Sequence, residues 1–245
     1  MTAHSDNRIA VVLFTGDAKR EGRQKCLPPR LLSNLHRQLI RTIDRIPSTD
    51  IFRVYVAKGV SYLCDGTRSV ELSRTGSLAF DVESALQETF SRGYGRVLLL
   101  AGDVCGLGES SIRNAIAQLE TTQSTLVAGR SGDGGFYLAG FNQLPDIEWS
   151  KIHWFSSDAA SSLVQEARTA GMIVAEVEQI DDIDDVRDAI KLSSQPIRGL
   201  WLAAQNLIRS FLMGASLSEL ADHATLREDL DRRAFQLPPP FPATH

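Results

Sequence analysis

Short apolar runs that alternate with amphipathic segments constrain the fold of this chain more than any other feature. Residues 9–14 and 96–101 are nearly continuous apolar runs, which are typical of strands covered on both faces in a parallel sheet. Between residues 31 and 46, leucine and isoleucine recur at helical spacing and arginines fall on the other faces. The alternation predicts an α/β fold with right-handed crossovers and a mainly parallel sheet between two layers of helices.

The remaining elements that we expect continue this alternation. The predicted strands cover residues 51–57, 124–128, 135–141 and 172–177, and the predicted helices cover residues 80–90, 109–119 and 158–170. We expect residues 15–29 to form a polar loop after the first strand. In such sheets the functional loops lie at the carboxyl ends of the strands.

Composition and length fit a cytoplasmic protein with one main domain. A chain of 245 residues with 43% hydrophobic side chains can bury a full core. The net charge is -4, and the sequence contains no long run of acidic or basic residues. We therefore expect neither a nucleic acid nor an anionic membrane as partner. Three widely spaced cysteines favour a reducing compartment. The first apolar run is too short for a signal peptide or a membrane span.

The alternating pattern ends after residue 188, and helical segments follow at 197–213 and 217–222. The tail contains three consecutive prolines from residue 238, which favour an extended chain. We therefore expect the α/β domain to cover residues 1–192 and a helical C-terminal appendage with a proline-rich tail to cover residues 193–245. The C-terminal helices are a candidate contact surface for a second copy of the chain or for a protein partner.

Asp103 is the first candidate site residue, because it follows the most apolar strand at its carboxyl end. A carboxylate in that place can face a cleft and hold Mg²⁺ or Mn²⁺ together with waters and substrate phosphates. The alternative is an aspartate that caps the following turn or helix.

Residues 131–135 (SGDGG) form a second candidate, a tight turn that enters a predicted strand. Gly134 and Gly135 allow the backbone to approach a ligand closely, and Asp133 can accept hydrogen bonds from a sugar or a base. A plain β-hairpin would also use Asp-Gly at this place, so that alternative stays open.

Four cations lie in the loop predicted after the first strand: Lys19, Arg20, Arg23 and Lys25. Arginine and lysine at a strand's carboxyl end can clamp phosphate groups. Solvated surface charge is the alternative, and the P-loop pattern is absent.

A late acidic run comprises five aspartates between residues 181 and 188. Most of them fit the N-terminus of a helix, where the dipole favours negative charge. Asp184 is the one that we single out as a candidate second metal ligand. Trp149 and Trp154 could stack on a base or sugar or could belong to the core, and Cys105 would need a nearby base to act as a nucleophile.

Four of these segments, in this order, are similar to a bacterial family of GT-A-type glycosyltransferases of unknown function, the domain of unknown function family 2064. That family is related to the guanylyltransferases for 2-phospho-lactate and the molybdenum cofactor. The resemblance covers residues 9–192. The matching segments are residues 22–27 (GRQKCL), 93–97 (GYGRV) with 102–107 (GDVCGL), 133–140 (DGGFYLAG), and the spaced aspartates 182, 184 and 188.

The resemblance implies a GT-A fold, that is, a Rossmann-like three-layer sandwich of the nucleotide-diphospho-sugar transferases, and it implies site roles. Asp103 and Asp184 would bind the metal, and Asp103 and Asp133 would be catalytic. The nucleotide and its phosphates would meet Arg23, Lys25, Gly102, Gly134 and Gly135.

The chain departs from the family pattern at four places: Leu27, Gly102, Cys105 and Arg130 stand where an arginine, an acidic residue and two prolines are usual. The leading hypothesis is a divalent-metal-dependent transferase that uses a nucleotide sugar as glycosyl donor. One alternative is a nucleotidyltransferase that uses a nucleoside triphosphate. The other is a pseudoenzyme that acts as a binding or partner subunit.

Overall fold

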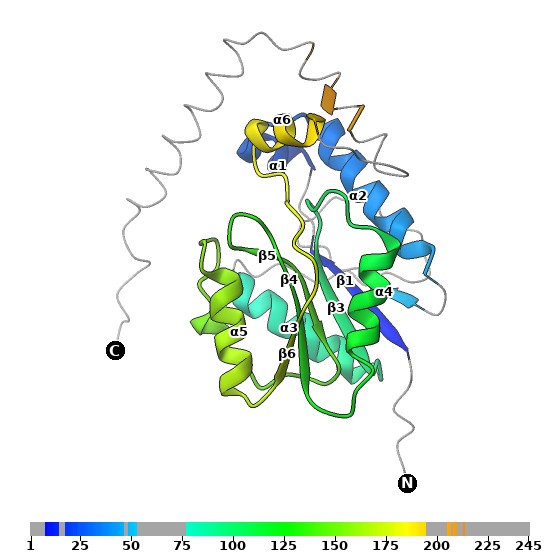
Figure 1. Ribbon diagram of the computed structural model, residues 1–245, viewed down its shortest axis with the longest axis vertical. Coiled ribbons are helices and arrows are strands. Elements are labelled where there is room, and N and C mark those ends of the chain that lie inside the picture. The colour runs from blue at the N-terminus through cyan, green and yellow to red at the C-terminus, as the bar shows by residue number, and fades with distance from the viewer. Residues whose placement is uncertain are drawn as a thin grey trace.

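The computed structural model describes residues 8–14, 18–46, 49–52, 77–194, 205–206, 208–209 and 213. Its centre is a six-stranded sheet with the strand order β2-β1-β3-β5-β4-β6 (Figure 1). The strands are β1 (Ile9–Phe14), β2 (Thr49–Phe52), β3 (Arg96–Ala101), β4 (Thr125–Arg130), β5 (Phe136–Phe141) and β6 (Ile173–Glu176). β5 runs antiparallel to both of its neighbours, and the other paired strands are parallel.

Helices cover both faces of this sheet and give the expected three layers. The described helices are α1 (Ala18–Lys25), α2 (Pro29–Asp44), α3 (Leu78–Ser91), α4 (Glu109–Gln118), α5 (Ala159–Thr169) and α6 (Val186–Ser194). Apolar residues of α2 and α4 share one buried cluster, and those of α3 and α5 share the other. The mainly parallel α/β fold predicted from the sequence is therefore confirmed.

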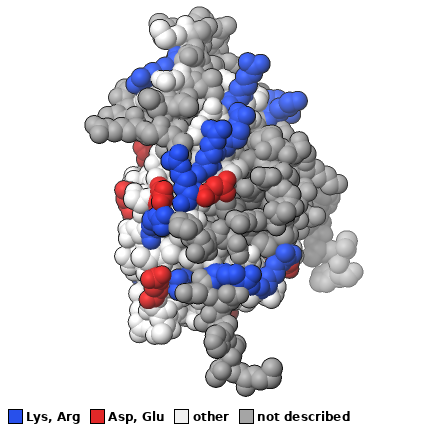
Figure 2. Space-filling model, turned by 90° about the vertical axis from the view of Figure 1, so that its right-hand side faces the viewer, with Lys and Arg blue, Asp and Glu red and all other residues white. Residues whose placement is uncertain are grey.

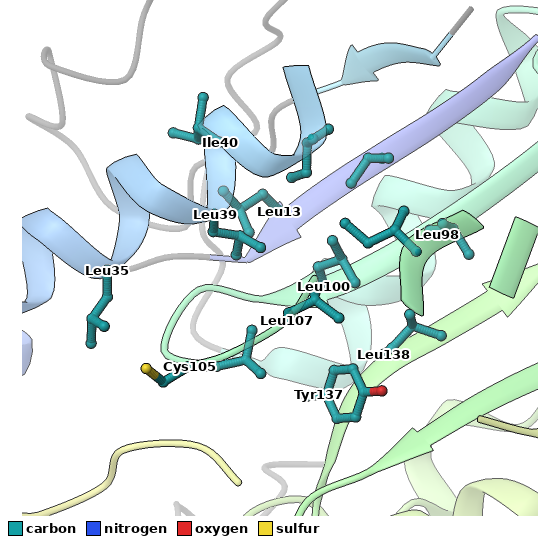
Figure 3. Packing of buried hydrophobic residues seen from close by; sticks show 14 of the residues in the cluster. Leu13, Leu35, Leu39, Ile40, Leu98, Leu100, Cys105, Leu107, Tyr137 and Leu138 are labelled. Carbon is teal, nitrogen blue, oxygen red and sulfur yellow. The ribbon is translucent and has the colours of Figure 1, made fainter. Parts of the chain in front are cut away.

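Residues that alternate along the strands divide between the two clusters, because successive side chains point to opposite faces of a sheet. Leu98 and Leu100 of β3 belong to the cluster under α2 and α4, whereas Leu99 belongs to the cluster under α3 and α5. Figure 3 shows the first cluster, where Leu39 of α2 lies beside Leu13 of β1. Strands buried on both faces explain the continuous apolar runs in the sequence.

The exposed side of α2 is basic. Its apolar residues are buried, as the helical spacing predicts, and four arginines lie on the opposite, exposed side. Figure 2 shows a band of Lys and Arg side chains on the side of the molecule where α2 lies. The exposed arginines of α2 are Arg30, Arg37, Arg41 and Arg45, the last being its C-cap.

The prediction of a polar loop over residues 15–29 is wrong, because residues 18–25 form α1. No apolar face marks this helix in the sequence, and tertiary packing stabilises it instead. A Cβ on Gly22 would lie 2.5 Å from the carbonyl oxygen of Leu27, so the end of α1 fits closely against the turn that follows. The backbone N–H of Leu27 donates to the carbonyl oxygen of Gly22 at 2.8 Å.

Several predictions for the C-terminal part and for the second strand lie outside the described residues. This holds for the predicted helix at 217–222, the proline-rich tail and the end of the strand beyond Phe52. In the segment 197–213, the described residues are helical, and Ile208 is fully buried in the cluster under α2. No described helix has the length and apolar character that a membrane crossing would require.

Candidate functional site

The candidate site forms where the chain after β6 returns to the carboxyl end of β3. Residue Asp182 forms an isolated antiparallel bridge with Val104. The N–H of Ile183 donates to the carbonyl oxygen of Asp103 at 3.2 Å. These backbone contacts place two segments that are far apart in sequence side by side, and they bring Asp184 close to Asp103.

Lys25, at the end of α1, binds both of these carboxylates. Its Nζ lies 2.5 Å from Oδ2 of Asp103, 2.8 Å from Oδ1 of Asp184 and 2.9 Å from the carbonyl oxygen of Ile183. An ammonium group has three N–H donors, so each donor has one acceptor here. The sequence interpretation assigned Lys25 to phosphate binding, and that role remains a prediction; the structure places its Nζ between Asp103 and Asp184.

Burial and the ion pairs shift the pKa values of Lys25 and Asp103 in opposite directions. The Lys25 side chain is only 15% exposed, and burial lowers its pKa, but the charges of Asp103 and Asp184 outweigh burial and raise it. For Asp103, burial raises the pKa, and the Lys25 charge and hydrogen bond outweigh burial and lower it. Both groups are therefore charged at neutral pH.

A second group of carboxylates lies next to this pair. Asp133, Asp182 and Asp184 each offer an oxygen, and these oxygens lie within 4.8 Å of one another. Burial and the charges of Asp184, Asp103 and Asp133 raise the pKa of Asp182 to about 7. Among the described residues, the charges of the neighbouring carboxylates therefore act with burial to favour the protonated form of Asp182.

This donor set fits a hard divalent cation. Mg²⁺ and Mn²⁺ prefer carboxylate oxygens, and a cation at this place would relieve the repulsion that raises the pKa of Asp182. The sequence interpretation assigned the metal to Asp103 and Asp184. In the structure Lys25 bridges that pair, whereas the oxygens close enough to share an ion belong to Asp133, Asp182 and Asp184.

The turn that holds Asp133 is the loop of a β-hairpin between β4 and β5, the alternative that the sequence left open. Oδ1 of Asp133 accepts hydrogen bonds from the Ser131 hydroxyl at 2.6 Å and from the Gly135 N–H at 2.9 Å. One carboxylate oxygen therefore stabilises the turn.

Gly134 joins this turn to the segment before α5. Its φ is +93°, and a Cβ there would lie 2.0 Å from the carbonyl oxygen of Ser157. The carbonyl oxygen of Gly134 accepts from the N–H of Ala160 at 3.1 Å. Gly134 is thus required for close packing of two backbone segments, and the nucleotide contact that the sequence assigned to it remains a prediction.

A cavity of about 530 Å³ opens beside the carboxylates. One part of its wall is acidic and contains Asp103, Asp133, Asp182 and Asp184. The other part is apolar and aromatic, and its described rings are Phe14, Phe136, Tyr137, Trp154 and Phe155. A cavity of this size accommodates a small-molecule substrate.

The remaining residues that the sequence predicts for the site have different environments. Arg23 is exposed on α1, and Gly102 is buried with its N–H bonded to the Phe14 carbonyl oxygen at 2.8 Å. Gly135 lines the cavity. Trp149 is buried and stacks on Trp154, which in turn lines the cavity, so the pair combines the core and wall roles considered from the sequence.

Three of the four departures from the family pattern have a structural explanation. Leu27 is 3% exposed and belongs to the core, and Cys105 is buried there too (Figure 3). Burial raises the pKa of the Cys105 thiol to about 12, which excludes an ionised nucleophile at neutral pH. Arg130 pairs with Glu176 on the neighbouring strand at 3.0 Å.

The acidic run before α6 is mostly a helix N-terminus, as the sequence suggested. Asp185 accepts from the N–H groups of Arg187 and Asp188, and Asp188 accepts from the N–H groups of Asp184 and Asp185. Asp182 is a site residue that the sequence interpretation did not select. Its spacing of two from Asp184 in an extended segment was a usable signal, since alternate residues share a side.

Comparison with known proteins supports the family resemblance. Residues 57–156 match the model of a family described as "Uncharacterized protein conserved in bacteria (DUF2064)". No protein with a curated description matches the sequence significantly.

Solved structures share the fold at low sequence identity. A protein provisionally called a nucleotide-diphospho-sugar transferase, from Desulfovibrio desulfuricans G20, superposes with a TM-score of 0.65 at 20% identity, covering 83% of this chain and 97% of that one. A nucleotidyl transferase from Methanothermobacter thermautotroptrophicus gives 0.53 at 16% identity, covering 76% and 96%.

A third structure, 4-diphosphocytidyl-2C-methyl-D-erythritol synthase from Anaerococcus prevotii DSM 20548, gives 0.51 at 11% identity, covering 87% and 100%. At these identities the likeness concerns the fold. Residues 57–156 are similar to the bacterial DUF2064 family, and the chain adopts the fold of the nucleotide-diphospho-sugar transferase structure.

Proposed function

We propose that this protein is a divalent-metal-dependent transferase that acts on a nucleotide-activated substrate, with a nucleoside diphosphate sugar as glycosyl donor. The observation that carries the proposal is the cluster of carboxylates from Asp133, Asp182 and Asp184 in the wall of the cavity. The fold shared with a nucleotide-diphospho-sugar transferase structure supports the choice of donor.

The protein's own residues have separate parts in this proposal. Asp133, Asp182 and Asp184 would hold Mg²⁺ or Mn²⁺, which would neutralise the charge that develops on the departing diphosphate. Lys25 keeps Asp103 and Asp184 in place, and it can bind a phosphate oxygen by exchanging one of its three acceptors. Arg23, exposed on the same helix, can supply a second phosphate contact.

In the transfer itself, the bond between the sugar carbon and the diphosphate oxygen breaks, and the diphosphate leaves with the electron pair. The acceptor hydroxyl oxygen bonds to the sugar carbon, and its proton passes to a carboxylate of the site. Asp103 is paired with Lys25 and its pKa is lowered, so it is poorly suited to take that proton.

Nucleotidyl transfer is the second candidate. Two of the structures with the same fold are, by their names, a nucleotidyl transferase and a diphosphocytidyl-methylerythritol synthase. In that case a nucleoside triphosphate would be consumed and diphosphate released. The same metal group and the same cations would serve both reactions.

One incubation separates the two candidates. The protein is given Mn²⁺ with a set of nucleoside diphosphate sugars, or with nucleoside triphosphates plus a phospho-acid, and the consumption of each nucleotide is measured. Loss of a nucleotide sugar supports glycosyl transfer. Loss of a triphosphate with diphosphate release supports the alternative.

A binding test identifies a non-catalytic relative. At a hundredfold excess over Kd, a nucleotide with Mn²⁺ should stabilise the fold by about 2.7 kcal/mol and raise the melting temperature. Asp182→Asn should abolish the Mn²⁺-dependent part of this rise. Asp146→Asn, the same change at an exposed position outside the cavity, is the matched control.

The catalytic proposal would be lost if no nucleotide shifted the melting temperature and Asp182→Asn behaved like Asp146→Asn. The hypothesis of a pseudoenzyme would then remain. It predicts that the C-terminal helices contact a partner protein. Those helices lie largely outside the described residues.

A further inference from the structure

Phe155 has an unusual position in the wall of the cavity. Its side chain is 87% exposed, although it is a large apolar residue, and its backbone φ is +61°. Few residues other than glycine adopt this region, and a bulky side chain there is a genuine outlier. The exposed ring gains little from burial in the fold, so the fold itself gives no reason for phenylalanine at this position.

The backbone on both sides of Phe155 is fixed by hydrogen bonds. The N–H of Trp154 donates to the carbonyl oxygen of Ile152 at 2.9 Å, and the Ser156 hydroxyl donates to the carbonyl oxygen of His153 at 2.7 Å. The N–H of Ala159 donates to the carbonyl oxygen of Ser156 at 3.1 Å. Phe155 is therefore presented by an ordered turn.

The neighbouring rings extend this surface inward. Trp154 and Phe136 have ring centroids 5.8 Å apart, and Trp154 stacks on Trp149 at 6.4 Å with an interplanar angle of 22°. The indole N–H of Trp154 donates to the carbonyl oxygen of Trp149 at 3.1 Å. Because its polar atom is already bonded within the protein, Trp154 offers the cavity an apolar ring.

Charge limits what can bind beside these rings. The described residues that line the cavity include four aspartates and neither lysine nor arginine. Lys25 reaches this group from the α1 side, through Asp103 and Asp184. Asp133 continues the group toward the Gly134–Ser157 contact, two residues from Phe155. An anionic group placed beside Phe155 would face the carboxylates without a described cation.

We propose that Phe155 and Trp154 form a stacking wall for the second substrate, and that this substrate presents a flat, uncharged ring face there. The inference rests on the proposed function, in which the diphosphate is bound on the Lys25 side of the carboxylates. It deepens that function by assigning an uncharged acceptor class and a specificity-determining residue, Phe155.

The test uses the full chain and two probes that share one ring. Phenyl β-glucoside is uncharged, whereas phenyl phosphate carries the same ring with a negative group. Binding of each is measured in metal-free buffer by calorimetry and by quenching of tryptophan fluorescence. Wild type should bind phenyl β-glucoside at least tenfold more tightly than phenyl phosphate.

Three variants test how much the Phe155 ring contributes to binding of the probe. Phe155→Gly suits the positive φ and removes the ring, so the apo melting temperature should not fall, while the affinity for phenyl β-glucoside should drop about 5- to 10-fold. Phe155→Tyr keeps the ring and should keep the affinity. Leu144→Ala, at an exposed apolar residue outside the described cavity wall, is the matched control and should leave binding unchanged.

Nucleotide binding distinguishes a failure here from a failure of the proposed function. With Mn²⁺, Phe155→Gly should bind the nucleotide within twofold of wild type. An equal loss of nucleotide affinity would overturn the assignment, because the ring would then stack on the base. Three further results would also overturn the assignment of Phe155. They are an unchanged affinity of Phe155→Gly for phenyl β-glucoside, no binding of that probe to wild type, and tighter binding of phenyl phosphate than of phenyl β-glucoside. None of these results contradicts the binding and consumption of a nucleotide by the wild-type protein with Mn²⁺, so the proposed function can hold when this assignment fails.

Discussion

The Nζ atom of Lys25 lies 2.5 Å from Oδ2 of Asp103, across 78 residues of sequence. The contact joins the end of α1 to the carboxyl end of β3, and Asp184 completes it at 2.8 Å. The ammonium therefore serves the fold and the site at once. A change at Lys25 should be visible in stability even without a substrate.

We expect Lys25→Met to reduce the free energy of unfolding at pH 7 by about 2–4 kcal/mol, because it removes the ammonium group that contacts Asp103 and Asp184. Urea unfolding measures the loss. Lys151→Met, which removes an exposed pair with Glu148, is the control and should change little. The double change Lys25→Met with Asp103→Asn should recover at least about 1 kcal/mol. Additive losses would show that the two residues are not coupled.

The same pair predicts a pH dependence. The pKa of Asp103 is lower in the folded state than its ordinary value of 3.8, so its contribution to stability is present above pH 3.8 and is lost as the pH falls through the folded pKa. The difference in stability between wild type and Lys25→Met should therefore shrink below pH 4. A difference that persisted unchanged at pH 2 would contradict this account.

The shifted pKa of Asp182 predicts the opposite pH dependence of stability. Its pKa is raised from 3.8 to about 7 in the folded state, so the folded protein binds the extra proton and its stability falls as the pH rises from 4 to 7. Asp182→Asn removes this penalty and should be more stable than wild type at pH 8, by roughly 2–4 kcal/mol, but not at pH 3. Mn²⁺ should stabilise wild type at pH 8 and stabilise Asp182→Asn much less. Equal stabilisation of both proteins by Mn²⁺ would remove Asp182 from the metal group.

Gly134→Ala should destabilise the fold by about 2–4 kcal/mol, because alanine is strained at φ +93° and its Cβ would collide with the Ser157 carbonyl oxygen. Gly106 has a φ of +90°, and no atom of the described residues lies within 4 Å of a Cβ built there. Gly106→Ala should therefore cost only about 1–2 kcal/mol. Thermal unfolding compares the two variants, and equal losses would mean that the Ser157 contact adds nothing.

Leu27→Arg, which restores the arginine usual in the family, should reduce stability by more than about 3 kcal/mol, because it places a charge in the core. Gln24→Arg adds the same charge at an exposed position of α1 and should stay within about 0.5 kcal/mol of wild type. A stable and more active Leu27→Arg protein would show that residue 27 can turn toward the phosphates.

The sequence was sufficient for the sheet because burial on both faces leaves a strong signal. β3 covers residues 96–101 as predicted, and α4 and α5 differ from their predicted bounds by one residue at an end or both. The antiparallel direction of β5 could also be predicted from the sequence, because the short loop 131–135 between β4 and β5 is too short for a crossover connection.

The helix α1 and the membership of the carboxylate group could not be predicted in the same way. α1 has no apolar periodicity, and its stability depends on Gly22 packing and on contacts of Lys25 with residues more than 70 positions away. Asp133 and Asp182 meet only because the chain after β6 pairs with Val104. Such long-range contacts have no local pattern from which to infer them.

The contact between Gly134 and Ser157 also limits how relatives of this protein can diverge or be recombined. Any insertion before α5 that displaced Ser157 would move the hairpin loop with it, and so would shift Asp133 away from Asp182 and Asp184. A chimaera that imports a foreign loop around Phe155 to change substrate range would have to import its own 131–135 segment as well. The two segments would therefore have to be exchanged together.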